Sequence, residues 1–141
     1  MAADSGVPAH RFAVRVYYED TDAAGIVYYA NYLRFAERAR TEWLRTLGFD
    51  HVRLDRDGGV GFAVRRCAVD YRRPARLDDV LEVATALKRA RGASVTLEQV
   101  VRRGEDELVR LDVELALLDA AGRPARFPDP LRAAFGPLVA T

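Results

Sequence analysis

The chain has 141 residues, 50% of them hydrophobic, which is enough for one domain with a substantial core but leaves little room for a second domain. Lysine and arginine number 22 and aspartate and glutamate 21, so the net charge of +1 argues against a nucleic acid or an anionic membrane as the main partner. One cysteine and two histidines supply neither an intramolecular disulfide nor a clustered metal site, and this usage favours a reducing cytoplasm.

The N-terminal segment MAADSGVPAHR lacks the basic start and apolar core that are typical of a secretion signal. No run of residues approaches the roughly 18 apolar residues of a membrane span, so we expect no membrane insertion. We predict a disordered lead over residues 1–10 and a single domain over residues 11–141.

The first structured element is predicted to be a strand within RFAVRVYYED, residues 11–20. Apolar or aromatic side chains occupy every second position, namely Phe12, Val14, Val16 and Tyr18. This alternation predicts a strand that ends near Asp20.

The hydrophobic period then changes from two residues to three and four, which predicts one long helix over residues 29–47. The side chains at these steps form a broad apolar stripe, made of Tyr32, Phe35, Ala36, Ala39, Trp43 and Leu47. Gly48 is suited to end this helix, because glycine readily adopts the left-handed conformation of a C-terminal cap.

Four strand-like segments follow a loop rich in charge and glycine, DRDGGVG. They are predicted at residues 62–71, 80–91, 93–103 and 107–118. The connections RRPARLDD, Gly92 and RGED are too short for helical crossovers, so neighbouring strands are expected to be antiparallel. Prolines punctuate the final segment, where one short helix is expected.

A strand, a long apolar helix and a set of antiparallel strands predict the α+β class, with the sheet covering the helix. Segments 80–87 and 109–117 are interpreted as apolar on nearly every side chain, including those turned away from the helix. Because an apolar second face needs a partner, we expect a homo-oligomer.

Acidic residues cluster where the first strand gives way to the helix, in YYEDTDAAGIVYY. If Asp22 lies beside the helix start, a bound acyl group would meet its carboxylate and the unpaired backbone N–H groups near residues 27–29. A base or nucleophile with an oxyanion site is the minimum that acyl transfer requires. The alternative is that Asp20 or Asp22 only caps a helix or turn, for which aspartate is well suited.

The stretch VYYEDTDAAGIVYYANYLRFAERARTEWLRTLGF resembles the signature of the 4-hydroxybenzoyl-CoA thioesterase family of hotdog-fold enzymes, in particular its branch of Tol-Pal-associated acyl-CoA thioesterases. The likeness continues through VDYRRPARLDDVLEV and RARGASV. It implies a hotdog fold, with an antiparallel sheet wrapped around one long central helix, and a homodimer or homotetramer. It also implies an acyl-CoA substrate, and no cofactor or metal is expected because coenzyme A belongs to the substrate.

The resemblance implies roles for particular residues. The second aspartate of the D-x-D pair corresponds to Asp22, the expected catalytic carboxylate, either as a general base on water or as a nucleophile that forms an anhydride. The backbone N–H of Tyr29 is expected to polarise the thioester carbonyl. The adjoining residues expected to bind substrate are Gly25, Ile26, Val27 and Tyr28. Many members of the branch carry a histidine where this chain has Tyr29, so an imidazole that could position water is missing here.

The nucleotide of coenzyme A requires a basic site. The resemblance implies one near the turn in KRARGAS, where Arg89, Arg91 and Ser94 are the expected contacts. The guanidinium group suits phosphate because it presents a fork of hydrogen-bond donors. For the arginines of DYRRPARLDD, a solvated turn is as good an explanation as phosphate binding.

Two other functions are possible on the sequence. A hotdog dehydratase acting on 3-hydroxyacyl thioesters would need a histidine beside an acidic residue, whereas neither His10 nor His51 is near the predicted helix start. A non-catalytic acyl-CoA binding or scaffold protein is the second alternative, which the missing histidine keeps open. Cys67 has no histidine nearby in sequence, so we expect a buried or packed structural cysteine and not a nucleophile.

Overall fold

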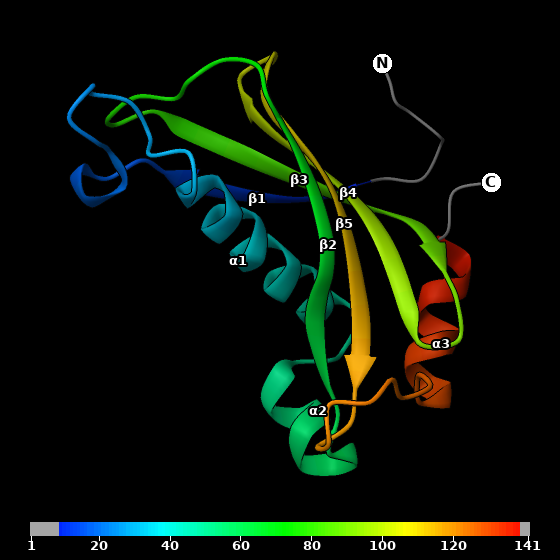
Figure 1. Cartoon of the computed structure of the whole chain (residues 1–141). Coiled ribbons are helices and arrows are strands. Elements are labelled where there is room, and N and C mark those ends of the chain that lie inside the picture. The colour runs from blue at the N-terminus through cyan, green and yellow to red at the C-terminus, as the bar shows by residue number, and fades with distance from the viewer. Residues whose placement is uncertain (1–8, 139–141) are drawn as a thin grey trace.

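The computed structural model describes residues 9–138, and residues 1–8 of the predicted disordered lead lie outside this range. Five strands form one antiparallel sheet in the order β1-β3-β4-β5-β2 (Figure 1). The strands are β1 His10–Arg15, β2 Gly61–Tyr71, β3 Val80–Ala90, β4 Ser94–Arg103 and β5 Asp106–Leu118. The helices are α1 Asn31–Thr46, α2 His51–Gly58 and α3 Asp129–Phe135, and short 3₁₀ turns span Tyr18–Asp20 and Gly136–Leu138.

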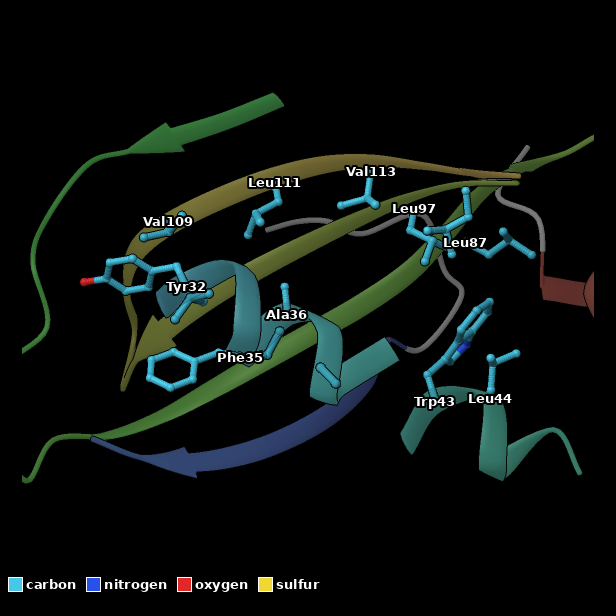
Figure 2. Packing of buried hydrophobic residues seen from close by; sticks show 14 of the residues in the cluster. Tyr32, Phe35, Ala36, Trp43, Leu44, Leu87, Leu97, Val109, Leu111 and Val113 are labelled. Atoms are coloured by element: carbon cyan, nitrogen blue, oxygen red, sulfur yellow. The ribbon is translucent and has the colours of Figure 1, made fainter. Parts of the chain in front are cut away.

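Helix α1 lies on the inner side of the curved sheet, against β1, β3 and β4 (Figure 1). Figure 2 shows Tyr32 and Ala36 facing the same core as Leu97 and Leu111 of the sheet. Each large side chain buried in this way stabilises the fold by about 1.5–3 kcal/mol relative to an exposed one. The predicted helix, its buried stripe and the α+β class are therefore confirmed, with the helix starting two residues later than expected.

Helix α1 is followed by Gly48, whose φ is 90°, as expected of a residue that stops a helix. The next segment differs from the prediction, because part of the expected loop DRDGGVG belongs to α2. Asp50 caps α2 by accepting a 2.8 Å hydrogen bond from Arg53 N–H, Leu54 packs into the core, and Gly59 ends the helix with a φ of 63°. A single buried side chain on a polar helix leaves no clear period in the sequence.

The first strand is shorter than predicted. β1 ends at Arg15 and not near Asp20. The N–H of Tyr17 donates to Asp20 Oδ2 over 2.8 Å, and this bond closes a 3₁₀ turn where a strand would have continued. Tyr18, expected on the buried face of the strand, is 81% exposed.

The four strands predicted between residues 62 and 118 fall within one residue of β2 to β5, but strands that follow one another along the chain are not all neighbours in the sheet. β3, β4 and β5 follow one another, whereas β2 pairs with the far side of β5 and forms an edge of the sheet. Residues 72–79, called here the crossover segment, join β2 to β3 across the ends of β5 and β4. Both Arg72 N–H and Arg73 N–H donate to the Leu108 carbonyl on this path.

The expectation of two apolar faces on the sheet is wrong. Alternate residues of β5 from Val109 to Leu117 are buried on the helix side, and the intervening side chains include Arg110. Arg110 forms ion pairs with Glu98 at 2.6 Å and with Glu107 at 2.8 Å across the outer face. The centre of the outer face is therefore charged. An apolar outer face cannot be the reason for a homo-oligomer.

Candidate functional site

The acidic stretch forms a small hairpin, which we call the Asp22 loop, residues 21–27. Thr21 pairs with Val27 across the loop, Asp22 N–H donates to the Ile26 carbonyl over 2.9 Å, and Gly25 N–H donates to the Asp22 carbonyl over 2.9 Å. Gly25 has a φ of 79°, a left-handed conformation that glycine adopts without a steric penalty. The turn thus places Asp22 at the exposed end of the hairpin.

The crossover segment contacts the Asp22 loop and holds it in place. Val27 N–H donates to the Ala75 carbonyl over 2.9 Å, and Ile26 forms a bridge with Arg76. Ala75 N–H in turn donates to the hydroxyl of buried Tyr32 on α1, also over 2.9 Å. The loop, the crossover segment and the first turn of α1 are consequently joined by backbone bonds and by the hydroxyl of a buried tyrosine, and none of these bonds depends on an exposed side chain.

The carboxylates of this stretch have separate environments. Asp20 is only 7% exposed, and its oxygens accept from Tyr17 N–H at 2.8 Å and from Asn31 Nδ2 at 2.9 Å. The alternative interpretation, in which an aspartate serves a turn, therefore describes Asp20. Asp22 is exposed, and Oδ1 accepts a 2.9 Å bond from Ala24 N–H. Its Oδ2 accepts no hydrogen bond from residues 9–138, so one oxygen is available for chemistry.

Some backbone N–H groups near the helix start are hydrogen-bonded, and others have no acceptor among the described residues. Val27 N–H is bonded to Ala75, and Tyr28 N–H donates to the Asp20 carbonyl over 2.9 Å. Among the described residues, the N–H groups of Tyr29 and Ala30 have no acceptor. Two successive free N–H groups can hold the oxygen of a carbonyl under attack. The sequence pointed to Tyr29, but nothing in it identified Ala30.

Aromatic rings surround these donors. The rings of Tyr28 and Tyr29 lie 5.0 Å apart, and Tyr71 at the end of β2 meets Tyr29 edge to face at 6.0 Å. The Tyr71 hydroxyl donates to the Tyr29 carbonyl over 3.1 Å. Burial raises the pKa of Tyr71, which keeps its hydroxyl protonated and able to donate. Tyr71 was not expected from the sequence, because it lies 42 residues from Tyr29 along the chain.

The expected nucleotide contacts gather elsewhere. Arg89, Arg91 and Ser94 line a groove of about 510 Å³ on the outer face of the sheet, called here the arginine groove. The other residues lining it are Arg65, Arg66, Ala68, Thr96, Asp112, Val113 and Glu114. Register shifts at residues 64–66 of β2 and 87–89 of β3 lie beside it, and such bulges turn side chains in new directions.

Arg89, Arg91 and Ser94 lie at the opposite end of the protomer from the Asp22 loop. The crossover segment beside the Asp22 loop leads into the start of β3 (Figure 1). Arg89 lies near the other end of β3, and Arg91 follows that end directly. An eleven-residue strand is about 36 Å long at about 3.3 Å per residue, so the structure does not bring the two sets of residues together within one chain.

Other candidate groups lie outside the Asp22 loop. Cys67 is exposed and not buried, because β2 is an edge strand that pairs only with β5 among the described strands. Partial burial of the sulfur nevertheless raises the pKa of the Cys67 thiol, which disfavours the thiolate. His51 on α2 bonds to Thr41 at 3.1 Å, and His10 lies in β1.

Within residues 9–138, no group of three or more His, Cys, Asp or Glu side chains is arranged to hold a metal ion. The same range contains no helix that is long and apolar enough to cross a membrane.

Comparison with known proteins gives a consistent result. The family described as the Thioesterase-like superfamily matches residues 16–135. The chain is 46% identical over 125 residues to the acyl-CoA thioesterase YbgC of Haemophilus influenzae, which covers 88% of this chain and 92% of that relative. It is 48% identical over 99 residues to the acyl-CoA thioester hydrolase YbgC of Escherichia coli O6:H1, which covers 70% and 73%.

Solved structures agree with this result. A probable thioesterase from Bartonella henselae matches with a TM-score of 0.82 at 41% identity, covering 85% of this chain and 99% of that chain. A protein from Thermus thermophilus, TT1821, matches with a TM-score of 0.86 at 27% identity, covering 92% and 98%. These similarities confirm the hotdog fold that the family resemblance implied.

Proposed function

We propose that this chain, which belongs to the Thioesterase-like superfamily, hydrolyses an acyl-CoA thioester to a free acid and coenzyme A. It is a thioester hydrolase, and the names of its relatives support acyl-CoA as the substrate. One observation supports the assignment to residues: Asp22 has a carboxylate oxygen that no group within residues 9–138 engages, and the end of the same loop leads to the free N–H groups of Tyr29 and Ala30.

In the proposed reaction, Asp22 acts as a general base on water. The water oxygen bonds to the acyl carbon while its proton passes to Asp22, and the N–H groups of Tyr29 and Ala30 donate to the developing oxyanion. The C–S bond then breaks with its electron pair on sulfur, and the proton held by Asp22 neutralises the thiolate of coenzyme A. No cofactor takes part in this scheme.

The covalent alternative is attack by Asp22 on the thioester carbonyl carbon, which breaks the C–S bond, releases the thiolate of coenzyme A and leaves an anhydride that water then cleaves at the Asp22 carboxyl carbon. A single turnover in oxygen-18 water separates the two routes. We expect label in the released acid only, because a general base never bonds to the acyl group. Label in the carboxylate of Asp22 would replace the general-base route with the covalent one.

The exposed inner side of β2 supports the proposal of a homodimer. Val64 and Tyr71 on this side are 51% and 43% exposed, although both pair with buried residues of β5. β2 is also an edge strand, whose free backbone groups can pair with those of a second strand. We propose that two copies pair through β2, which would cover these side chains and join the two sheets.

The dimer also accounts for the distance between the two candidate sites. Because Arg89, Arg91 and Ser94 lie about one strand length from the Asp22 loop of their own chain, they can serve the Asp22 loop of the second copy. We propose that Arg89, Arg91 and Ser94 of one copy bind the nucleotide of an acyl-CoA that is hydrolysed by the other. A tetramer would be a dimer of such dimers.

The test of the function is release of free coenzyme A from short, medium, long and aromatic acyl-CoAs, measured by thiol detection. Asp22→Asn should lower kcat by about 10²- to 10⁴-fold with little change in KM, since it removes the general base alone. Glu19→Gln is the matched control, because Glu19 is an exposed neighbouring carboxylate, and it should leave kcat unchanged. Equal activity of wild type and Asp22→Asn would exclude Asp22 as the catalytic carboxylate.

If the wild type released no coenzyme A, two further measurements would distinguish the alternative functions. Binding of acyl-CoA in calorimetry without thiol release would indicate a binding or scaffold protein. Hydration of an enoyl-CoA would indicate a dehydratase. We also propose that the chain belongs to the Tol-Pal-associated branch of the 4-hydroxybenzoyl-CoA thioesterase family. We propose a cytoplasmic location as well, which the single cysteine favours.

A further inference from the structure

Asp20 is the most buried carboxylate of the acidic stretch and accepts more hydrogen bonds than a turn requires. Its Oδ2 accepts from Tyr17 N–H at 2.8 Å, and its Oδ1 accepts from Asn31 Nδ2 at 2.9 Å. Its backbone carbonyl accepts from Tyr28 N–H at 2.9 Å. Asp20 therefore contacts the turn before the Asp22 loop, the residue after that loop, and the first residue of α1.

Along the chain, the residues that donate hydrogen bonds to Asp20 lie on both sides of each proposed reacting group. Asp22 lies two residues after Asp20, and Tyr29 lies between Tyr28 and Asn31, the two residues that donate to Asp20. A shift of Asp20 relative to α1 would consequently change the position of the Asp22 carboxylate relative to the Tyr29 N–H. Catalysis depends steeply on such positions, since a displacement of about 1 Å can cost about 10²-fold in rate.

We propose that the side-chain hydrogen bond between Asp20 and Asn31 is a positioning device that sets the Asp22 carboxylate against the free N–H groups at the start of α1. The proposal rests on the proposed hydrolysis and adds two residues that do not themselves touch substrate. Asp20 is 7% exposed and both its oxygens are engaged, so it acts through Asp22 and is not a second base.

The chemistry of the pair suggests variants that separate position from charge. A carboxylate only accepts hydrogen bonds, whereas an amide both donates and accepts. In Asp20→Asn, the new amide oxygen can still accept from Tyr17 N–H, and its NH₂ can donate to Asn31 once the Asn31 amide has turned over. In Asn31→Asp, two carboxylates face each other at the former 2.9 Å contact, and their repulsion breaks it.

The experiment measures kcat, KM and the thermal unfolding midpoint for four proteins: wild type, Asp20→Asn, Asn31→Asp and the double exchange Asp20→Asn with Asn31→Asp. We expect Asn31→Asp to lower kcat by about tenfold or more, with KM within about twofold, because the reacting groups are displaced. We expect Asp20→Asn to stay within about threefold of wild type, because the hydrogen bond survives without the charge. The double exchange should recover kcat, since an amide at position 20 then donates to a carboxylate at position 31.

Arg38→Ala, on the exposed face of α1, is the matched control for a change in this helix and should leave kcat unchanged. An Asn31→Asp variant with wild-type kcat would overturn the proposal, as would a double exchange that stays as slow as Asn31→Asp while unfolding at the wild-type temperature. A large loss of kcat in Asp20→Asn alone would show that the charge of Asp20 matters and its position does not. Failure of the proposed function looks different, because the wild type itself would then release no coenzyme A.

Discussion

The hydroxyl of Tyr71 donates a 3.1 Å hydrogen bond to the carbonyl of Tyr29, and the two rings meet edge to face at 6.0 Å. Tyr71 is the last residue of the edge strand β2, and Tyr29 carries one of the free N–H groups before α1. The edge of the sheet that we propose to pair with a second copy is thus connected directly to the proposed oxyanion site. Pairing at β2 and the geometry of that site are expected to influence each other.

Removal of this hydrogen bond should affect catalysis more than folding. Tyr71→Phe leaves the ring contacts and removes a bond worth about 0.5–1.5 kcal/mol, so we expect kcat/KM to fall about 2- to 12-fold. Steady-state kinetics and thermal unfolding on the same samples check this. Tyr18→Phe is the control, since Tyr18 is 81% exposed, and an equal loss of activity in both variants would contradict the prediction.

The arginine groove should recognise the nucleotide and not the acyl group. Arg89→Ala and Arg91→Ala each remove a charged donor worth about 1.5–3 kcal/mol, so KM for acyl-CoA should rise about tenfold or more with kcat little changed. An acyl-pantetheine, which lacks the nucleotide, should show the same KM with wild type and variants. Arg56→Ala on α2, whose side chain is 72% exposed, is the matched control. If both substrates lost affinity equally, the groove would not be the nucleotide site.

A charge on the inner side of β2 should weaken self-association and activity together. Val64→Glu places a carboxylate on a side chain that the proposed dimer would bury, and an unpaired buried charge is strongly unfavourable. Sedimentation velocity should show a shift from dimer to monomer over a concentration series, with a parallel loss of thioesterase activity. Val52→Glu is a matched control on α2, where valine is 73% exposed. A fully active monomeric Val64→Glu protein would refute the proposal that two copies form the site.

The buried amide of Gln99 should contribute strongly to stability. Gln99 is fully buried, and its Nε2 donates to the Ala36 carbonyl at 3.0 Å and to Thr85 Oγ1 at 2.9 Å, while Oε1 accepts from Arg40 at 3.0 Å. Gln99→Met keeps the side-chain length but leaves buried groups unpaired, at a cost of about 1–3 kcal/mol for each. Urea unfolding should show a lower midpoint with an unchanged slope. Leu97→Met, a volume-conserving change in the same strand, should cost less than about 1.5 kcal/mol.

Stability should depend on Glu107 at acidic pH. The hydrogen bond from Arg110, with further attraction from Arg72, holds the pKa of Glu107 below its ordinary value of 4.5. A lowered pKa in the folded state means that this contribution is present above about pH 4.5 and is lost as the pH falls through the folded-state value. Urea unfolding from pH 7 to pH 3 should therefore show a smaller decline for Glu107→Gln than for wild type. Asp129→Asn, whose side chain is 93% exposed, should follow wild type, and parallel curves for all three proteins would contradict the prediction.

The sequence determined those features that depend on neighbours along the chain. The period of Tyr32, Phe35 and Ala36 was enough to predict α1, because a helix buries the residues that its own pitch aligns. The strands β2 to β5 were predicted to within one residue for the same reason. Asp22 and Tyr29 could be proposed together because they lie close along the chain, so no long-range contact had to be known.

The tertiary structure decided what depends on contacts between distant segments. Nothing in the local pattern placed β2 beside β5, and that pairing alone brings Tyr71 to Tyr29 and leaves Cys67 exposed. The separation of the arginine groove from the Asp22 loop follows from the length of β3, which becomes meaningful only once both ends are located. Local periodicity reports the burial of a residue within its own element, whereas pairing between elements is settled by the collective packing of the core, which no short stretch encodes.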